Sequence, residues 1–431
     1  MNRRAPLLAA GALLAGGAEI WLAHASSGPG GILERRYGLL GLIGIWVVAY
    51  AVAVLCALRL PPRWAIGLVL VLGLAMRLAA ISPKAPLSDD LYRYAWDGVV
   101  QTHGIDPYRF APTAPELIPL RDPWLWPAHG PRSGTQINRA GVRTIYPPVA
   151  EAWFTLEHLV TPLGARDRGY ERVGLVLDLA VLAVLLALLR DRRWLALYAL
   201  SPLPVLEAVQ NAHVDTLAVL LALVAVVLAE RRRPTSAVVV LALATLTKIY
   251  PVVLLPLLLR NRASRTRSGA VFAGVCALAY LPHVVAVGTN ILGYLPGYLR
   301  EERYGSGTRY LLLGLFGLRG IDATLLALVL LAALAVWALR TSLPLLPAAT
   351  RLMTGVLLLV TPAQPWYALL LLALATSAVA WWTVPVTLAS YPLFFALVLD
   401  GPSQLVGRLS WAVAAGLAAV GFQVSRRRRS G

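Results

Sequence analysis

The chain has 431 residues, of which 58% are hydrophobic and 14% charged, and its formal net charge is +18. This composition excludes a soluble globular protein and indicates an integral membrane protein. The positive charge does not indicate binding to nucleic acid, and no nucleic-acid partner is expected, because the basic residues are concentrated in short connectors between apolar runs. These connectors are Arg3-Arg4, Arg190 to Arg193, Arg231 to Arg233, Arg260 to Arg267 and Arg426 to Arg429.

Apolar runs follow one another along the chain, and most are roughly 17–23 residues long, enough for a helix to cross about 30 Å of hydrocarbon. They predict an all-α, polytopic protein with about 12–14 transmembrane helices, folded as a single integral membrane domain over residues 1–431. The predicted spans are 5–25, 37–59, 62–82, 171–190, 193–206, 212–229, 268–288, 322–340, 344–361, 365–382, 384–399 and 405–424. An apolar pair near 236–259 is interrupted at Lys248, and the stretch 145–162 is either another span or a helix lying shallow in the membrane.

The basic connectors also predict the orientation of a multi-pass protein in the cell membrane. By the positive-inside rule, both termini lie in the cytoplasm. The segments 83–145, 207–212, 289–310 and 361–365 then face outward, and they are rich in aromatic, Pro, acidic and His residues. We therefore expect the active site on the outer face. Ala23-His24-Ala25 resembles a signal-peptidase site, but the apolar stretch before it is long for a signal peptide, which favours a retained helix.

The outer segment 83–145 carries a charged, aromatic motif directly after a predicted span, namely Ser88-Asp89-Asp90-Leu91-Tyr92-Arg93-Tyr94-Ala95-Trp96-Asp97-Gly98. Helical spacing places Leu91 and Tyr94 on one side and the charged residues on another, which predicts an amphipathic helix at the membrane interface. The alternative is an interfacial helix whose acids only face water. It does not explain two adjacent Asp residues at the end of a span, where carboxylates are costly unless they are used.

Further motifs follow this one in the outward-facing segments. Asp106-Pro107-Tyr108 forces a turn, and Tyr146-Pro147-Pro148 suits the start of a helix. Together with the Asp-Asp-x-Tyr-x-Tyr-x-x-x-Gly pattern, they resemble the GT-C superfamily of multi-spanning glycosyltransferases that use polyprenyl-phosphate sugars. The likeness is greatest to bacterial polyprenol-phosphate-mannose-dependent α-mannosyltransferases, and it extends to Lys248-Ile249-Tyr250-Pro251, Asn211-Ala212-His213-Val214-Asp215 and Gln364-Pro365-Trp366-Tyr367. In many relatives the acidic motif follows the first span and not the third, so the subfamily stays open.

The resemblance implies transfer of a sugar, with inversion at its anomeric carbon, from a polyprenyl-phosphate donor to an envelope lipid or glycan acceptor. Such a step needs a carboxylate that takes the proton of the acceptor hydroxyl. Asp90 matches the family's Asp that precedes x-Tyr, so we assign it this role. Asp89 would orient a substrate hydroxyl, hold a cation, or act as the base itself.

The departing lipid phosphate needs cationic or dipolar groups. Lys248 interrupts an apolar run, so it must reach a polar cavity or the membrane surface. His213 is either a substrate contact or a solvent-exposed residue near a helix start. The full set of expected donor-phosphate and substrate contacts is Lys248, Arg93, Arg143, Arg309, His213, Tyr146 and Tyr250. No metal site or cofactor is predicted, although the two Asp residues could hold a divalent cation with phosphate oxygens.

Other functions are also compatible with a polytopic membrane protein. A lipid or glycan transporter or flippase would often show two related halves, and none is visible here. A glycan ligase or polymerase would use Arg and His in a large outer loop, whereas this one opens with acids. A structural scaffold would leave the Asp89-Asp90 pair without a purpose.

Overall fold

The computed structural model describes residues 5–27, 32–81, 87–128, 134–161, 164–398 and 401–430. Every regular element in these ranges is helical, and no strand occurs among them. The all-α prediction is therefore confirmed. The first basic connector, Arg3-Arg4, and residues 83–86 and 129–133 of the outer segment lie outside the described residues.

Seven helical segments among the described residues are long and apolar enough to cross a membrane. They are α1 (Ala5–Ser26), α2 (Ile32–Arg59), α3 (Pro62–Ala80), α12 (Arg265–Val287) with η5 (Gly288–Leu292) and α13 (Leu295–Glu301), α15 (Gly320–Arg340), the run of η7 (Trp381–Thr383), α18 (Val384–Leu388) and α19 (Ser390–Val398), and α20 (Ser403–Ser430). An eighth would be a broken span, in which α8 (Pro202–Pro204) and η3 (Val205–Gln210) meet α9 (Asp215–Glu230) at 116°. The protein is thus a multi-pass membrane protein.

The predicted number of about 12–14 spans is larger because it includes shorter apolar helices. These are α10 (Pro234–Thr247), α16 (Leu345–Val360), and η6 (Pro365–Ala368) with α17 (Leu369–Ser377). A 14-residue helix such as α10 is roughly 21 Å long and does not cross the hydrocarbon alone. Proline and polar residues interrupt these runs, as at Pro251 and Pro365. The remaining elements of the bundle are α6 (Asp167–Leu188), η2 (Arg192–Leu195), α7 (Ala196–Ala199), η4 (Tyr250–Leu254), α11 (Leu255–Leu258) and α14 (Leu311–Gly314).

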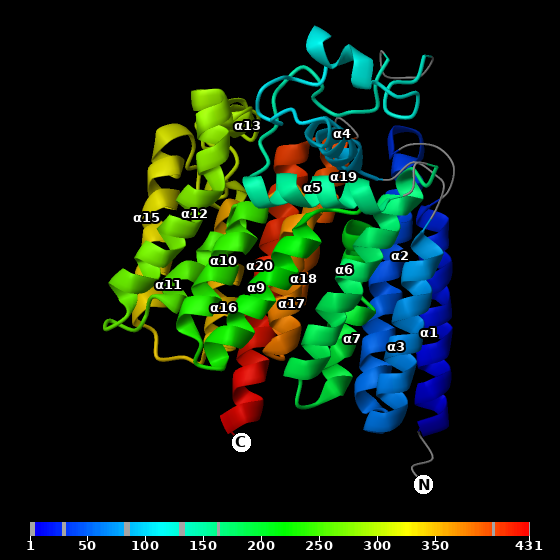
Figure 1. Cartoon of the computed structure of the whole chain (residues 1–431). Coiled ribbons are helices and arrows are strands. Elements are labelled where there is room, and N and C mark those ends of the chain that lie inside the picture. The colour runs from blue at the N-terminus through cyan, green and yellow to red at the C-terminus, as the bar shows by residue number, and fades with distance from the viewer. Residues whose placement is uncertain are drawn as a thin grey trace.

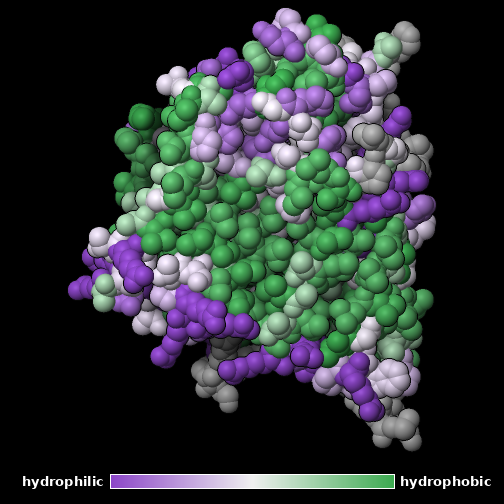
Figure 2. Space-filling model, in the orientation of Figure 1, coloured by the Kyte–Doolittle hydropathy of each residue, from purple (hydrophilic) through white to green (hydrophobic). Residues whose placement is uncertain are grey.

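The upright helices form one bundle with two different ends (Figure 1). Helices α1, α2 and α3 pack together on one side, and α12 and α15 lie on the opposite side. Helix α1 begins and α20 ends at one end of the bundle, whereas the outer segment with η1 (Pro115–Leu120) covers the other end. Figure 2 shows a broad hydrophobic band between two more hydrophilic ends. This arrangement is that of a membrane-embedded bundle in which α1 begins and α20 ends at the same end.

The stretch 145–162 forms α5 (Pro148–Val160), which begins after Pro147 and lies across the ends of the upright helices (Figure 1). Its 13 residues extend roughly 20 Å, too short for a span. The shallow alternative is therefore the one that the structure adopts.

The predicted amphipathic helix is α4 (Asp90–Thr102), which packs on α5. It does not lie at a wet interface, because every residue from Leu91 to Gly98 is buried, including Arg93 and Asp97. Gly98 allows the close approach of the two helices: a Cβ at this position would lie 2.5 Å from the carbonyl oxygen of Phe154. The outer segment and α5 thus hold α4 in place, and its N-terminal end reaches the cavity described below.

Candidate active site

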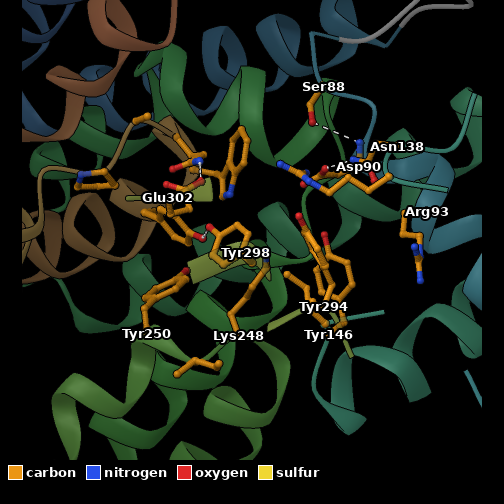
Figure 3. Close-up of a pocket in the computed structure, with 18 of the residues that line it drawn as sticks. Ser88, Asp90, Arg93, Asn138, Tyr146, Lys248, Tyr250, Tyr294, Tyr298 and Glu302 are labelled. Carbon is orange, nitrogen blue, oxygen red and sulfur yellow. Dashed lines mark hydrogen bonds between the residues drawn. The ribbon is translucent and has the colours of Figure 1, made fainter. Parts of the chain in front are cut away.

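A cavity of about 1320 Å³ lies beneath the outer segment, at the N-terminal end of α4. Polar and aromatic side chains from α4, the loop before α5, the break after α10, and α13 line one part of it (Figure 3). Hydrophobic side chains of α15, α16 and α19 line another part, namely Leu331, Met353, Val356, Leu357, Val360, Phe394, Leu397 and Val398. One continuous space therefore offers both a polar site and an apolar wall.

Asp89 and Asp90 stand at the start of α4 and line this cavity. Acidic groups are favoured at a helix N-terminus, where the dipole is positive. The amide nitrogen of Asn138 donates hydrogen bonds to Oδ1 of Asp89 at 3.1 Å and to Oδ1 of Asp90 at 2.6 Å (Figure 3). The backbone N–H of Asp90 donates to Ser88 Oγ at 3.3 Å. The predicted catalytic pair thus lies side by side in a defined position.

His213 lies on the other side of Asp90 and is buried. Its Nδ1 is 3.6 Å from Oδ2 of Asp90, and its Nε2 is 3.4 Å from Oε2 of Glu207. The ring stacks on Trp366 with centroids 4.0 Å apart. Glu207 also accepts a hydrogen bond from Tyr391 at 2.8 Å. The imidazole is therefore held between two carboxylates, and its solvent-exposed alternative is wrong.

The side chain of Asn211 forms hydrogen bonds both to Glu207 and to the segment that precedes the Asp pair. Asn211 donates to Glu207 Oε2 at 2.9 Å, and its Oδ1 accepts from the backbone N–H groups of Leu87 and Ser88 at 2.9 and 3.2 Å. The segment that precedes Asp89 is thereby tied to the turn that carries His213.

Lys248 enters the cavity from the break between α10 and η4. Its backbone is extended, with φ −143° and ψ 143°, so the helix stops where the lysine begins. The ammonium Nζ is 3.2 Å from Oδ2 of Asp215 and 4.9 Å from the centroid of the Tyr146 ring. It is also close enough to Asp90 for the two charges to attract each other. The predicted cation thus faces the same cavity as the predicted base.

Two tyrosines expected at the site also line the cavity. The ring of Tyr146 meets Tyr94 edge to face, with centroids 5.2 Å apart, and supports Lys248. Tyr250 meets Tyr367 edge to face at 5.5 Å. Both rings are therefore fixed by aromatic neighbours around the lysine.

Arg309 lines the cavity but is already engaged by protein groups. Its guanidinium forms an ion pair with Glu302 and lies 4.5 Å from the centroid of the Tyr304 ring. Oε1 of Glu302 accepts from Gln364 at 2.5 Å. Arg309 and Glu302 thus form a second charged pair in the cavity wall.

Arg93 and Arg143 occupy the edge of the cavity. The Arg93 guanidinium donates to both oxygens of Asp97, at 3.0 and 2.9 Å, and to the carbonyl of Val142 at 3.0 Å. Arg143 is exposed, and its Nε donates to the carbonyl of Arg109 at 3.1 Å. The structure therefore brings Lys248, His213 and Tyr146 close to Asp90, places Tyr250 in the same cavity, and leaves Arg93 and Arg143 bonded to other groups.

A second pair of acids comes from α4 and α5 and does not line the cavity. Asp97 and Glu151 are buried, at 2% and 0% exposure, and share the neighbourhood of Arg93. Burial raises the pKa of Asp97. Burial, together with the charge of Asp97, raises the pKa of Glu151 well above its usual value. Glu151 Oε1 accepts from Thr144 Oγ1 at 2.6 Å, so this cluster connects α4 to α5 and the loop before it.

Several residues of the site were not predicted from the sequence. Asp215 stands in the sequence only as the last residue of the Asn211 to Asp215 motif, whereas in the structure it carries the ion pair with Lys248. Glu302 and Glu207 gave no signal beyond their acidic character in segments that are predicted to face outward. Asn138 gave none, because its partners lie about fifty positions away. In the described ranges, no group of three or more His, Cys, Asp or Glu side chains could hold a metal ion.

The model of Glycosyltransferase family 87 matches residues 145–362, which are 218 of the 431 residues. The chain belongs to glycosyltransferase family 87. This membership makes it a membrane glycosyltransferase and favours that interpretation over a transporter or a scaffold. The family 87 range contains Tyr146, His213, Lys248, Tyr250 and Arg309, whereas α4 with the Asp pair precedes it. No curated protein and no solved structure matches the chain.

Proposed function

We propose that this protein transfers a sugar, mannose by the resemblance, from a polyprenyl-phosphate donor to a lipid or glycan acceptor on the outer face of the cell membrane, with inversion. The observation that carries the proposal is the shared cavity: a carboxylate pair and a lysine line the same space as a wall of hydrophobic side chains. A donor with a charged phosphate and a long apolar chain matches both parts. Membrane lipids surround the bundle.

Asp90 is the general base in this mechanism. Its Oδ2 takes the proton of the acceptor hydroxyl while that oxygen attacks the anomeric carbon. The new bond joins the acceptor oxygen to this carbon, and the bond to the phosphate oxygen breaks. The phosphate leaves with the electron pair. His213 Nδ1, 3.6 Å from Oδ2, is placed to receive the proton afterwards, and Glu207 supports the imidazolium from the other side.

Lys248 stabilises the departing phosphate, because its ammonium group faces the cavity and its side chain is only 14% exposed. Asp215 holds the ammonium in place, and the ring of Tyr146 offers it a cation–π contact. Arg309 is the second cation of the wall, and Asp89 orients an acceptor hydroxyl beside the base. The proposed mechanism uses no metal ion at the Asp pair.

The donor class can be tested with purified protein in lipid nanodiscs. Radiolabelled polyprenyl-phosphate mannose, glucose and arabinose, and a nucleotide-linked mannose, are each incubated with native lipid extract. We expect label to enter an acceptor from polyprenyl-phosphate mannose, at a rate that is roughly 10²–10⁴-fold lower with the Asp90→Asn variant. Transfer from another polyprenyl-phosphate sugar would show that the sugar is not mannose and would still support a polyprenyl-phosphate donor. Transfer from the nucleotide-linked sugar alone would overturn the proposal.

The proposed orientation rests on the basic connectors, namely Arg190 to Arg193 before α7, Arg231 to Arg233 between α9 and α10, and Arg260 to Arg267 after α11. It can be tested in a cysteine-free background, with Cys56 and Cys276 replaced by Ala. A membrane-impermeant maleimide should label Arg143→Cys in intact cells. It should label Arg262→Cys, an exposed position in the connector before α12, only after the membrane is opened. The reverse pattern would contradict an outer active site.

A further inference from the structure

One amide group stands between the two adjacent carboxylates of the site. Asn138 Nδ2 carries two N–H bonds, and one reaches Oδ1 of Asp89 while the other reaches Oδ1 of Asp90. Carboxylates accept and do not donate, so only the nitrogen of this amide suits the position. The Oδ2 of Asp90 is not part of this contact and faces His213.

The loop that carries Asn138 is anchored independently of the Asp pair. Ile137 is buried at 3% exposure among the aromatic residues of the outer segment. Thr135 Oγ1 donates to the carbonyl of Leu125 at 3.0 Å, and the backbone N–H of Gln136 donates to the same carbonyl at 2.9 Å. The loop that carries the Asn138 amide is therefore held in place by contacts that do not involve the two carboxylates.

We propose that Asn138 is a positioning residue that holds Asp89 and Asp90 side by side and leaves Oδ2 of Asp90 for the proton of the acceptor. This proposal rests on the proposed function, because it takes Asp90 as the general base and states which of its two oxygens receives the proton. Two adjacent carboxylates repel each other, and such pairs tend to share one proton. Two N–H donors between them oppose that sharing, because hydrogen bonds to the charged form favour it.

Other charged and titratable groups face Asp90 and are unchanged by substitution of Asn138. They come from α4 itself, the loop before α5, the turn before α9 and the break after α10, and they are Tyr94, Arg139, Tyr146, His213 and Lys248. A change in the protonation of the Asp pair in an Asn138 variant is therefore attributable to the amide.

The test uses Asn138→Asp, which has nearly the same shape, removes both donors and adds a third carboxylate. We expect the acidic limb of the pH profile of kcat/KM to move to higher pH by about one unit or more, and kcat to fall with little change in KM. Asn138→Ser keeps one donor and adds no charge. The acidic limb of its pH profile should therefore also move to higher pH, but by less than that of Asn138→Asp. Asn290→Asp, at an exposed position near α13, is the matched control and should leave the limb in place.

A second readout does not depend on turnover. Hydrophobic carbodiimides modify protonated carboxyl groups, and mass spectrometry can follow this modification in the peptide that carries Asp89 and Asp90. In Asn138→Asp and Asn138→Ser, modification should persist to higher pH than in the unsubstituted protein. An unchanged labelling profile in both variants would overturn the proposal, whether or not their activity or stability is lower. Absence of sugar transfer by the unsubstituted protein would instead refute the proposed function and leave the labelling test intact.

Discussion

The ammonium nitrogen of Lys248 lies 3.2 Å from Oδ2 of Asp215, whose side chain is completely buried. The two residues come from the break after α10 and from the first turn of α9, so the pair joins two helices beside the cavity. A charge in such a place requires a partner, because removing one member leaves the other buried and unpaired. The pair is therefore expected to serve both stability and phosphate binding.

Two substitutions separate these roles. Lys248→Met should abolish transfer and lower the free energy of unfolding by about 3–5 kcal/mol, because Asp215 loses its counter-charge. The double variant Lys248→Met with Asp215→Asn removes both charges and should regain much of the stability. It should not regain transfer, because the phosphate still lacks its cation. Thermal unfolding and transfer rates check both parts, and transfer by the double variant would exclude Lys248 from the phosphate site.

Gly98→Ala tests the close contact between α4 and α5. The added Cβ would lie 2.5 Å from the carbonyl oxygen of Phe154 and 2.8 Å from Cβ of His158, so the helices must separate. We expect a loss of about 1–3 kcal/mol in stability and a lower transfer rate, since Asp90 moves with α4. Gly141→Ala is the control, because nothing lies within 4 Å of its added Cβ. Equal melting temperatures for the two variants would contradict this account of the contact between α4 and α5.

The buried Glu151 predicts a dependence of stability on pH. Its pKa is raised by burial, so the folded protein binds this proton more tightly than the unfolded chain does. The free energy of unfolding should therefore fall as the pH rises from the usual pKa of 4.5 towards the raised one. Glu151→Gln removes this titration and should make stability depend less on pH above the usual pKa of 4.5.

The control for this prediction is Glu116→Gln, because Glu116 lies exposed in η1 of the same outer segment. Its thermal unfolding should keep the pH dependence of the unsubstituted protein. The same slope for Glu151→Gln would show that the buried carboxyl of α5 does not titrate as its surroundings indicate.

Local features of the sequence identified the parts of the site that depend on local structure. The Asp89-Asp90 pair at a span end, Lys248 in a broken apolar run and Tyr146 before a Pro-Pro start all line the cavity. Each disrupts a hydrophobic pattern, which a membrane chain tolerates only where a polar space is available.

Contacts across the chain could not be predicted in the same way. Arg93 lies within the acidic motif, yet its partners are Asp97 and the carbonyl of Val142. Asn138 is an ordinary loop residue until folding brings it to the carboxylates. The same limit applies to the spans, because the length of an apolar run does not show where a helix bends or stops short, as it does before Lys248.

The central claim is that Asp90 is the base, and Asp90→Asn tests it most directly, because the change keeps the shape and removes the basic oxygen. Donor binding and thermal stability should be retained while turnover of polyprenyl-phosphate mannose falls by roughly 10²–10⁴-fold. Asp89→Asn, the matched variant at the neighbouring carboxylate, should show a smaller kinetic loss. A larger loss for Asp89→Asn would assign the role of the base to Asp89 and leave Asp90 to orient the acceptor hydroxyl. Near-normal turnover in both variants would contradict the mechanism.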